Sequence, residues 1–261
     1  MHFWLTLFLI FFLASCSSID KNNRPAQVIK GLSAGYVLIP IEEDLGSGYI
    51  ITKNSKKFLV FGLPYVYEDT SINLADRTIL VEYFDFGESR IEINEDSLVN
   101  PSLEDRERAS AEFLEVKKIV SNISPQLNEE FIFIPPINTL ITSPFGKRRF
   151  INNNPRSPHM GLDIRGSVGT PIVAPKDGIV VLADNHFYSG NIVILDHGGG
   201  LFTSYSHLDS YDVEVNSKVL QGQAFASAGS TGRVTGPHLH WVVYLNGNRI
   251  NPETLIDLER L

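Results

Sequence analysis

The sequence predicts a mainly β protein, in which one helix joins a small N-terminal β-sandwich-like domain to a larger C-terminal all-β domain. Runs rich in valine, isoleucine, tyrosine and phenylalanine alternate with clusters of glycine, asparagine, aspartate and proline, a pattern typical of strands and turns. Only residues 103–122 repeat apolar side chains at helical spacing. After Pro135-Pro136 glycine stands at most junctions between the predicted strands, which marks the start of the second domain.

Residues 1–15 are predicted to be a lipoprotein signal peptide. The apolar run 3–13 is about eleven residues long, too short for a bilayer core of roughly 30 Å but suited to an export signal. It closes with Leu13-Ala14-Ser15-Cys16, which resembles the lipobox of bacterial lipoproteins and would make Cys16 the lipidated N-terminus. Because the segment before the run has no Lys or Arg, a simple cleaved signal with an incidental cysteine is the alternative.

Ser17 follows the cysteine, as in lipoproteins that are sorted to the outer membrane. We therefore expect an exported protein that a lipid on Cys16 anchors at the cell envelope, at the outer membrane and facing the periplasm. Residues 16–29 are polar and are expected to be a flexible tether.

The N-terminal β-domain is predicted to span residues 30–100, as an antiparallel sandwich or barrel of about 65 residues. It carries no catalytic constellation. Its expected strands are residues 36–41, 49–52, 58–63, 79–84 and 90–94.

A helix and a linker are predicted for residues 101–135. Ser102 is a suitable N-cap, and the two acidic residues that follow Leu103 suit the first helical turn. Apolar side chains at Phe113, Val116 and other positions of this segment recur at helical spacing, so we expect an amphipathic helix over 103–122. Ser124-Pro125 would end it.

Residues 136–261 are predicted to form the second domain, almost entirely from strands. The expected strands are residues 170–173, 178–183, 191–196, 203–207, 224–228 and 240–245. Helix is nearly absent from this part of the chain.

Charge and cysteine content exclude some functions. Acidic residues outnumber basic ones by 30 to 22 and the basic residues are scattered, so a nucleic-acid partner is not expected. Cys16 is the only cysteine, which excludes an intramolecular disulfide and any cysteine-based metal site in the folded body. A bound metal must therefore use His, Asp or Glu.

The histidines of the C-terminal half offer such ligands. His238 and His240 flank Leu239 in a predicted strand, so both rings should project from one face, about 6.6 Å apart along the chain. His159 and Asp163 would be roughly 13 Å apart in an extended strand, too far to share an ion, so a bend is needed. Gly161 is placed to allow that bend.

Two imidazoles and a carboxylate make the set of three ligands that a catalytic zinc uses, with one position left for water. The alternative is that each histidine is an ordinary surface or capping residue. His186 and His197 lie in expected turns with nothing paired beside them, and we interpret both as structural.

Three blocks of sequence carry a specific resemblance. They are His159-Met160-Gly161-Leu162-Asp163, Tyr205-Ser206-His207-Leu208, and Gly229-Ser230-Thr231-Gly232 followed by Gly236-Pro237-His238-Leu239-His240. From about residue 143, where Ser143-Pro144-Phe145-Gly146 leads in, the chain resembles the lysostaphin and LytM-type zinc endopeptidases.

This resemblance implies a LytM-like antiparallel sheet and an enzyme that cuts peptide cross-links of bacterial peptidoglycan, with stem peptides as substrate. It further implies that His159, Asp163 and His240 bind Zn²⁺, while His238 and His207 stand beside the ion. A zinc-activated water would be the nucleophile. We expect His238 to be the general base and His207 to orient water or stabilise the oxyanion, although the two roles could be exchanged.

Some relatives have lost ligands, so a catalytically silent LytM-like lipoprotein that binds the wall or activates an amidase is the alternative function. All five positions are filled here, which favours an active enzyme. The chain has no His-Glu-x-x-His helix and no Gly-x-Ser-x-Gly turn.

Three neighbours of these motifs have two interpretations each. Tyr205 is expected on the same strand face as His207, either lining the groove or packed in the sheet. Arg148 and Arg149 could meet substrate carboxylates or simply be solvated. The oligomeric state is not predicted.

Overall fold

The computed structural model describes residues 27–42, 47–75, 77–92, 101–129, 131 and 133–256. The predicted signal peptide, Cys16 and most of the predicted tether lie outside these residues. Strand β1 (Gln27–Leu32) begins inside the segment expected to be a tether, so the end of that segment is a strand. Among the described residues, no helix has the length and hydrophobicity needed to cross a membrane.

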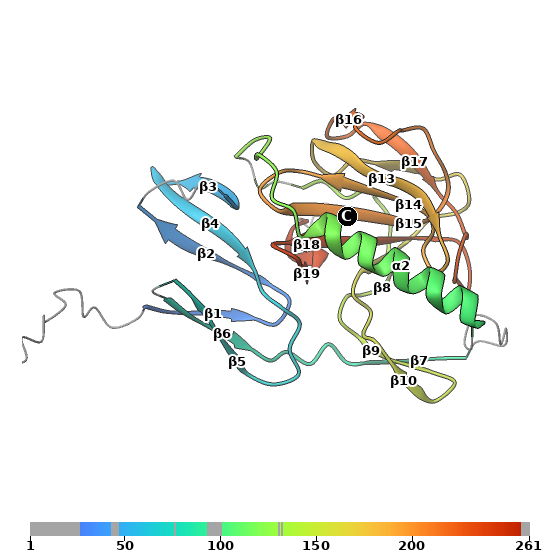
Figure 1. The fold of residues 1–261 in the computed structure, drawn as a ribbon, viewed down its shortest axis with the longest axis horizontal. Helices are drawn as coiled ribbons and strands as arrows, with labels where there is room; N and C mark the ends of the chain where they lie inside the picture. Colours follow the sequence, from blue (N-terminus) through green and yellow to red (C-terminus); the bar gives the residue numbers. More distant parts are fainter. Residues whose placement is uncertain are drawn as a thin grey trace, which may run out of the picture.

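Two three-stranded sheets form the N-terminal part of the molecule (Figure 1). The first contains β2 (Tyr36–Ile41), β3 (Tyr49–Lys53) and β4 (Lys56–Gly62), and the second contains β1, β5 (Thr70–Leu74) and β6 (Arg77–Glu82). Their apolar side chains pack together in one cluster, as in a small sandwich.

The prediction of a wholly antiparallel N-terminal domain is wrong at one pair of strands. β1 and β6 run parallel, from Gln27 opposite Arg77 to Leu32 opposite Glu82. Four other strands separate β1 from β6 in the sequence, so no hairpin turn fixes their relative direction.

Strand β7 (Glu88–Ile91) belongs to a different sheet. It pairs in parallel with β9 (Arg148–Ile151), which in turn pairs with β10 (Asn154–Arg156). The end of the N-terminal part is therefore hydrogen-bonded to a segment of the C-terminal half.

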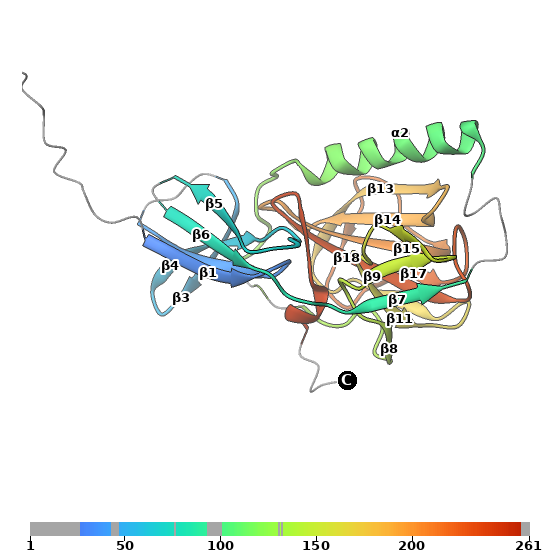
Figure 2. The same ribbon diagram turned by 90° about the horizontal axis from the view of Figure 1, so that it is seen from below.

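Helix α2 (Leu103–Val120) is the single long helix of the described residues. The Ser102 hydroxyl accepts a hydrogen bond from the backbone N–H of Asp105, which confirms the expected N-cap. The helix ends two residues before the predicted boundary. It lies along the face of β13 and β14 (Figures 1 and 2), where Val120 packs against side chains of the sheet.

A ten-stranded sheet dominates the C-terminal half, and all its strand pairs are antiparallel. The main path runs β16-β13-β14-β15-β18-β11-β8, with β12, β17 and β19 off this path. The bounds are β8 (Ile141–Ser143), β11 (Leu162–Arg165), β12 (Pro171–Val173), β13 (Gly178–His186), β14 (Gly190–Asp196), β15 (Leu201–Tyr211), β16 (Lys218–Val219), β17 (Ala224–Ala228), β18 (His238–Leu245) and β19 (Asn248–Ile250), followed by the short 3-10 helix η1 (Pro252–Thr254). The predicted fold class, mainly β with an antiparallel sheet in the C-terminal half, is confirmed.

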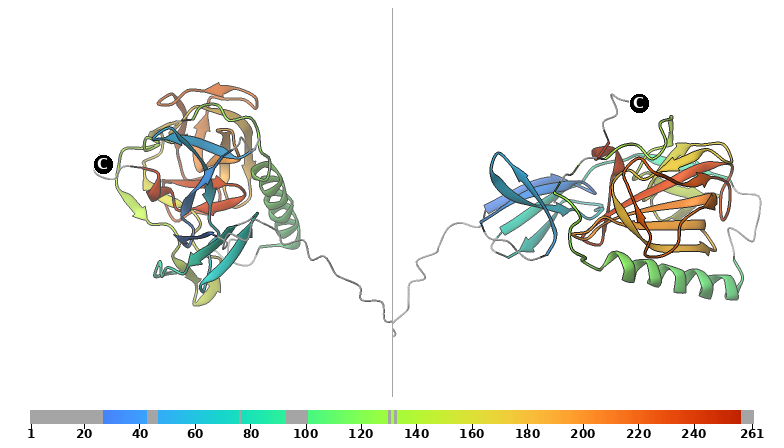
Figure 3. Two further views of the ribbon diagram at one scale, coloured as in Figure 1. Left: turned by 90° about the vertical axis from the view of Figure 1, so that its left-hand side faces the viewer. Right: turned by 90° about the horizontal axis from the view of Figure 1, so that it is seen from above.

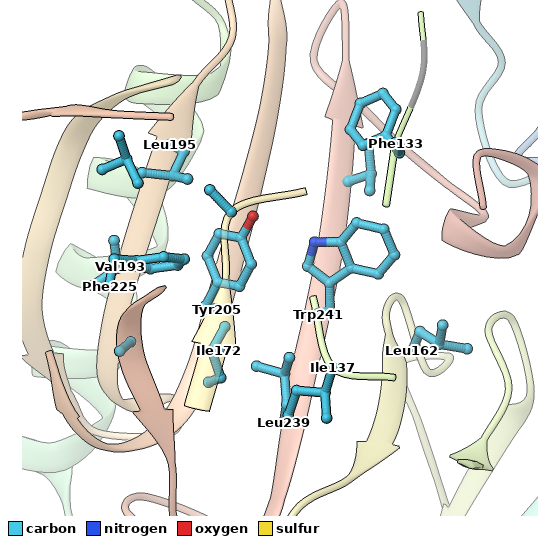
Figure 4. Close-up of a cluster of buried hydrophobic side chains, with 14 of the residues drawn as sticks. Phe133, Ile137, Leu162, Ile172, Val193, Leu195, Tyr205, Phe225, Leu239 and Trp241 are labelled. Carbon is cyan, nitrogen blue, oxygen red and sulfur yellow. The ribbon is translucent and has the colours of Figure 1, made fainter. Parts of the chain in front are cut away.

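The two faces of this sheet are covered differently. One face carries the main apolar core, in which Tyr205 of β15, Trp241 of β18 and Phe225 of β17 are fully or almost fully buried (Figure 4). Phe202, Val242 and their neighbours form a second cluster on the face that α2 covers. Alternate residues of β18 therefore point to the core and to the α2 side.

The N-terminal sheets lie at one end of the large sheet (Figure 3) and contact it closely. Tyr49 and Val60 belong to the main core of the C-terminal half. The backbone N–H of Gly62 donates to Oδ1 of Asn246 at 2.7 Å, and the Gly62 carbonyl accepts from the side chain of Asn248 at 3.0 Å. The two halves thus share both apolar packing and hydrogen bonds.

Candidate metal centre

Three side chains converge on the α2 side of the large sheet, where β11 pairs with β18. Nε2 of His159 lies 2.9 Å from Oδ1 of Asp163 and 3.2 Å from Nδ1 of His240, and the last two atoms are 2.7 Å apart. Among the described residues these three form the one group that could hold a metal ion. Asp163 and His240 are opposite each other on β11 and β18, so strand register brings them together.

The hydrogen bonds around His159 determine which of its nitrogens is available. Nδ1 lies 3.0 Å from the carbonyl oxygen of Pro144, and because a carbonyl oxygen can only accept, Nδ1 carries the proton. In the neutral ring Nε2 then has a free lone pair, which points at the Asp163 carboxylate. Buried imidazoles that ligate metals are commonly oriented in this way by a backbone carbonyl.

The triangle is therefore rich in electron pairs and needs a positive charge at its centre. Burial would raise the pKa of Asp163, but hydrogen bonding and attraction from the His159 and His240 rings outweigh it and lower that pKa. Burial also lowers the pKa of His240, which disfavours a proton as the source of the charge. A divalent cation fits this donor set of two imidazoles and one carboxylate.

Gly161 makes the bend that the His159–Asp163 spacing requires, just before β11 begins. A Cβ atom at this position would lie 2.5 Å from Cε1 and 2.7 Å from Nε2 of His240. Glycine is therefore needed here for the space that the His240 ring occupies, since its φ lies outside the left-handed region and the bend itself does not require glycine.

Two further imidazoles stand beside the triangle. Nε2 of His238 is 3.7 Å from Oδ1 of Asp163, and the His207 ring lies 4.9 Å from the ring of His238 and 5.8 Å from that of His240, measured between centroids. Leu239 is fully buried in the core, so His238 and His240 project from the same face, as predicted.

Both rings are fixed through Nδ1. His207 donates to the carbonyl of Thr231 at 2.9 Å, and His238 donates to the carbonyl of Gly236 at 2.8 Å. Burial, together with repulsion from His240 and His238, lowers the pKa of His207 to about 3, although the Thr231 carbonyl and Asp163 act in the opposite direction. His207 is thus neutral near pH 7, with Nε2 free to accept a hydrogen bond.

A β-bulge turns His207 toward the other histidines. The register between β15 and β14 jumps from Tyr205 opposite Val193 to Leu208 opposite Asn191, so Ser206 and His207 together face one residue of β14. His207 has a φ of 63°, in the left-handed region that non-glycine residues rarely adopt. Strain of this kind is commonly found at functional sites.

This bulge corrects the prediction for Tyr205. Simple alternation placed Tyr205 and His207 on one face, but Tyr205 is fully buried in the core and its hydroxyl hydrogen-bonds to that of Thr203. Tyr205 is a packed strand residue, because the extra residue of the bulge reverses the alternation at His207.

The other candidate residues from the sequence differ in the partners that their side chains contact. Arg148 forms ion pairs with Glu88 at 3.3 Å and Asp85 at 3.9 Å, whereas Arg149 lies 3.7 Å from Oδ2 of Asp163. His197 is fully buried and away from the triangle, as expected of a structural residue. His186 ends β13, also buried, with Nε2 lying 3.6 Å from Glu115.

A cleft adjoins the triangle, and part of its wall comes from α2. Its lining includes His159 and His240 of the triangle, Ser204 and Ser206 of β15, and the α2 side chains Ala109, Glu112, Phe113 and Val116. No pattern in the sequence connects α2 with the site. The apolar positions of α2 predict that this face packs against something, but not that the cleft lies there.

Comparison with known proteins relates the part of the chain that carries this site to a protein family. Residues 157–252 match the profile of Peptidase family M23. The chain therefore contains a peptidase M23 domain. The matched residues include the three of the triangle and the two imidazoles beside it, namely His159, Asp163, His240, His238 and His207.

Curated relatives match the M23 half of the chain. Peptidoglycan DD-endopeptidase ShyA of Vibrio cholerae is 42% identical over 112 residues, which cover 42% of this chain and 26% of ShyA. The DD-carboxypeptidase/endopeptidase Mpg of Neisseria meningitidis is 36% identical over 118 residues, covering 45% of this chain and 27% of Mpg. The chain thus spans about a quarter of the length of these relatives.

One solved structure resembles nearly the whole chain. A Pseudomonas aeruginosa protein assigned to peptidase M23 aligns with a TM-score of 0.68 at 26% sequence identity, covering 86% of this chain and 94% of that one. The likeness extends over the N-terminal sheets as well as the M23 domain.

Proposed function

We propose that this protein is a zinc metalloendopeptidase that hydrolyses peptide cross-links of bacterial peptidoglycan. The observation that carries the proposal is the convergence of one donor atom each from His159, Asp163 and His240 within 3.2 Å of one another, with two fixed imidazoles beside them. Relatives named as peptidoglycan endopeptidases support the choice of substrate, the stem peptides of the wall.

In this proposal His159 Nε2, Asp163 and His240 Nδ1 hold the ion. Zinc bound there would polarise the scissile carbonyl and supply an activated water as the nucleophile. The Pro144 carbonyl keeps the His159 ring in the required tautomer, and β18 pairing with β11 holds His240 against Asp163.

His238 and His207 would assist the transfer of the proton from the attacking water to the leaving amine. Because Nδ1 of each ring donates to a backbone carbonyl, Nε2 of each neutral ring can accept a proton and later release it to the leaving amine. His238 lies closer to the triangle, at 3.7 Å from Asp163, and we assign it as the general base. A neutral His207 in this tautomer accepts rather than donates, which favours a role in orienting water over one in stabilising an oxyanion.

The location of the protein at the cell envelope is part of the same proposal. A wall hydrolase must reach peptidoglycan outside the cytoplasm, and the N-terminal sequence with Cys16 fits export and a lipid anchor at the outer membrane. Radiolabelled fatty acid should be incorporated into the wild-type protein and not into Cys16→Ser.

The proposal is tested with Asp163→Ala. The purified wild-type protein should contain about one zinc and clear isolated peptidoglycan, whereas Asp163→Ala should lose more than about a hundredfold in metal affinity, and clearing with it. Asp212→Ala is the matched control, because Asp212 is exposed and outside the centre.

Three results would contradict the proposal. The first is zinc-loaded wild-type protein that leaves walls of several types intact. The second is clearing that survives complete removal of metal. The third is loss of clearing in the Asp212 control. Intact wall together with zinc binding would instead favour the silent wall-binding alternative.

A further inference from the structure

Arg149 differs from the other charged residues near the metal centre. Its side chain is 27% exposed, lines the cleft and lies 3.7 Å from Oδ2 of Asp163. Within the described parts of the chain, this is its single ion pair and its guanidinium makes no hydrogen bond. A guanidinium has five N–H donors, so a largely buried one with a single carboxylate 3.7 Å away and no hydrogen bond has donors left for an anionic ligand.

Its neighbour Arg148 shows the contrast. Arg148 is more exposed, at 45%, yet it has two carboxylate partners, Glu88 and Asp85. The protein therefore supplies acceptors to the outer arginine and leaves the inner one open to the cleft.

Further arginines add positive charge on the same side. Arg156 pairs with Arg149 in the β9–β10 ladder, and Arg233 stacks on the Tyr188 ring at 4.0 Å, where Tyr188 also lines the cleft. Burial lowers the pKa of Arg149, and Arg233 lowers it further, while Asp163 raises it. The chain as a whole carries a net charge of −8, so a cationic cleft edge does not follow from its composition.

We propose that Arg149, supported by Arg233, binds a free carboxylate of the substrate directly beside the scissile bond. This inference rests on the proposed function and deepens it. Arg149 reaches one oxygen of Asp163 while the other oxygen belongs to the donor triangle. A carboxylate on Arg149 would therefore lie next to a carbonyl at the metal centre.

The chemistry of a peptide identifies which carboxylate this is. The carboxylate nearest to a scissile carbonyl is the α-carboxylate of the residue whose amine leaves, because only the amide nitrogen and one α-carbon separate them. A diamino dicarboxylic acid uses one amine and one carboxyl group in its own peptide chain, so when its second amine forms the cross-link, the second carboxylate, beside that amine, stays free. Cross-links through a peptide bridge lack a free carboxylate there, so Arg149 selects the first class over the second.

The test uses two cross-linked muropeptide dimers that differ in one group, the carboxylate beside the leaving amine, which is free in one and amidated in the other. The wild-type protein should cleave the free acid with a kcat/KM at least about tenfold higher, the size expected for a charged bidentate contact. Arg149→Met should abolish the preference, and Arg233→Met should reduce it. Zinc content is measured for each variant, because Arg149 is close to Asp163.

Arg249→Met is the matched control. Arg249 lines the same cleft but lies over the Tyr244 ring, four residues along β18 from His240, and its removal should leave the preference unchanged. Calorimetry on metal-free protein gives a second readout independent of catalysis. The free acid should bind the wild type at least about tenfold more tightly than the amide, and Arg149→Met should bind both equally.

Equal cleavage and equal binding of the two dimers by the wild type would overturn the inference and leave the proposed function standing. A preference that survives in Arg149→Met would also overturn it. If zinc-loaded wild-type protein cuts neither dimer, the proposed function fails and the inference falls with it.

Discussion

At the scale of single residues, the site depends on backbone positions as much as on side-chain chemistry. His207 reaches its neighbours because it occupies the bulge with positive φ, and His240 fits because residue 161 has no side chain. Neither feature changes the identity of a donor atom, but both determine where the donor atoms of the two histidines lie.

Gly161→Ala tests this dependence. The added methyl would meet the His240 ring at 2.5 Å and Val242 at 2.9 Å, so the ring must move away from Asp163. We expect zinc affinity to fall by about ten- to a hundredfold while the fold is retained, as measured by competition with a chelating dye and by circular dichroism.

Gly236→Ala is the control for a methyl added near the site, because a Cβ there meets nothing within 4 Å. It should bind zinc as tightly as the wild type. Unchanged affinity in Gly161→Ala would show that the ring has room that the structure does not indicate.

At the scale of elements, α2 has two roles on one face of the sheet. Its C-terminal part closes an apolar cluster with Val120, and its middle forms a wall of the cleft beside the candidate metal centre. Glu112 ties the helix to the start of the β13–β14 loop by accepting from the backbone N–H of Phe187 at 2.8 Å. The helix is therefore held as a fixed wall of the cleft.

Phe113→Ala tests α2 as a substrate contact. Phe113 lines the cleft although its side chain is half-exposed, so a bound peptide would cover it. Losing that apolar contact should raise KM for soluble muropeptides by about three- to tenfold, with kcat nearly unchanged. Leu114→Ala should change neither constant, since Leu114 is equally exposed but lies outside the cleft lining. Equal effects of the two substitutions would argue against a cleft role.

At the scale of the whole molecule, the N-terminal part braces the segment that carries His159. Phe86 packs edge-to-face on Phe145, and the Tyr65 hydroxyl donates to the Gly146 carbonyl. The N–H of Gly146 in turn donates to the carbonyl of His159 at 2.7 Å. Residues far from the cleft in sequence thus help to position a candidate metal ligand.

The stability of the fold should depend on pH through His197. This ring is fully buried, donates from Nδ1 to the Asp177 carbonyl and accepts from the Thr203 hydroxyl. Burial lowers its pKa to about 4 from 6.5, so between these values the unfolded chain binds more protons than the folded one. The contribution of His197 is intact above pH 6.5 and is lost as pH falls toward 4, by roughly 3 kcal/mol in total.

Urea unfolding at several pH values measures this loss. In His197→Gln the free energy of unfolding should fall less steeply between pH 6.5 and 4 than in the wild type, whatever its absolute stability. A chelator is present throughout so that metal release does not contribute. Identical slopes for the two proteins would exclude His197 as the source.

Much of the site could be predicted from the sequence because its signals are local. The His238-Leu239-His240 alternation predicts two rings on one strand face, and the short spacing from His159 to Asp163 requires a bend, which Gly161 provides. The bounds of β2 and the start of α2 also follow from local pattern and capping. Each depends on neighbours within a few residues.

Only the tertiary structure decided the features that depend on distant partners. The parallel β1–β6 pair and the position of α2 along the cleft arise from contacts between segments far apart in the chain. The bulge that separates Tyr205 from His207 arises from the register that β15 takes against β14. Local propensity carries no information on such pairings, because their free energy comes from burial and register across the sheet. The sequence by itself thus determined which residues could bind a metal, and the packing of the strands determined that three of them meet.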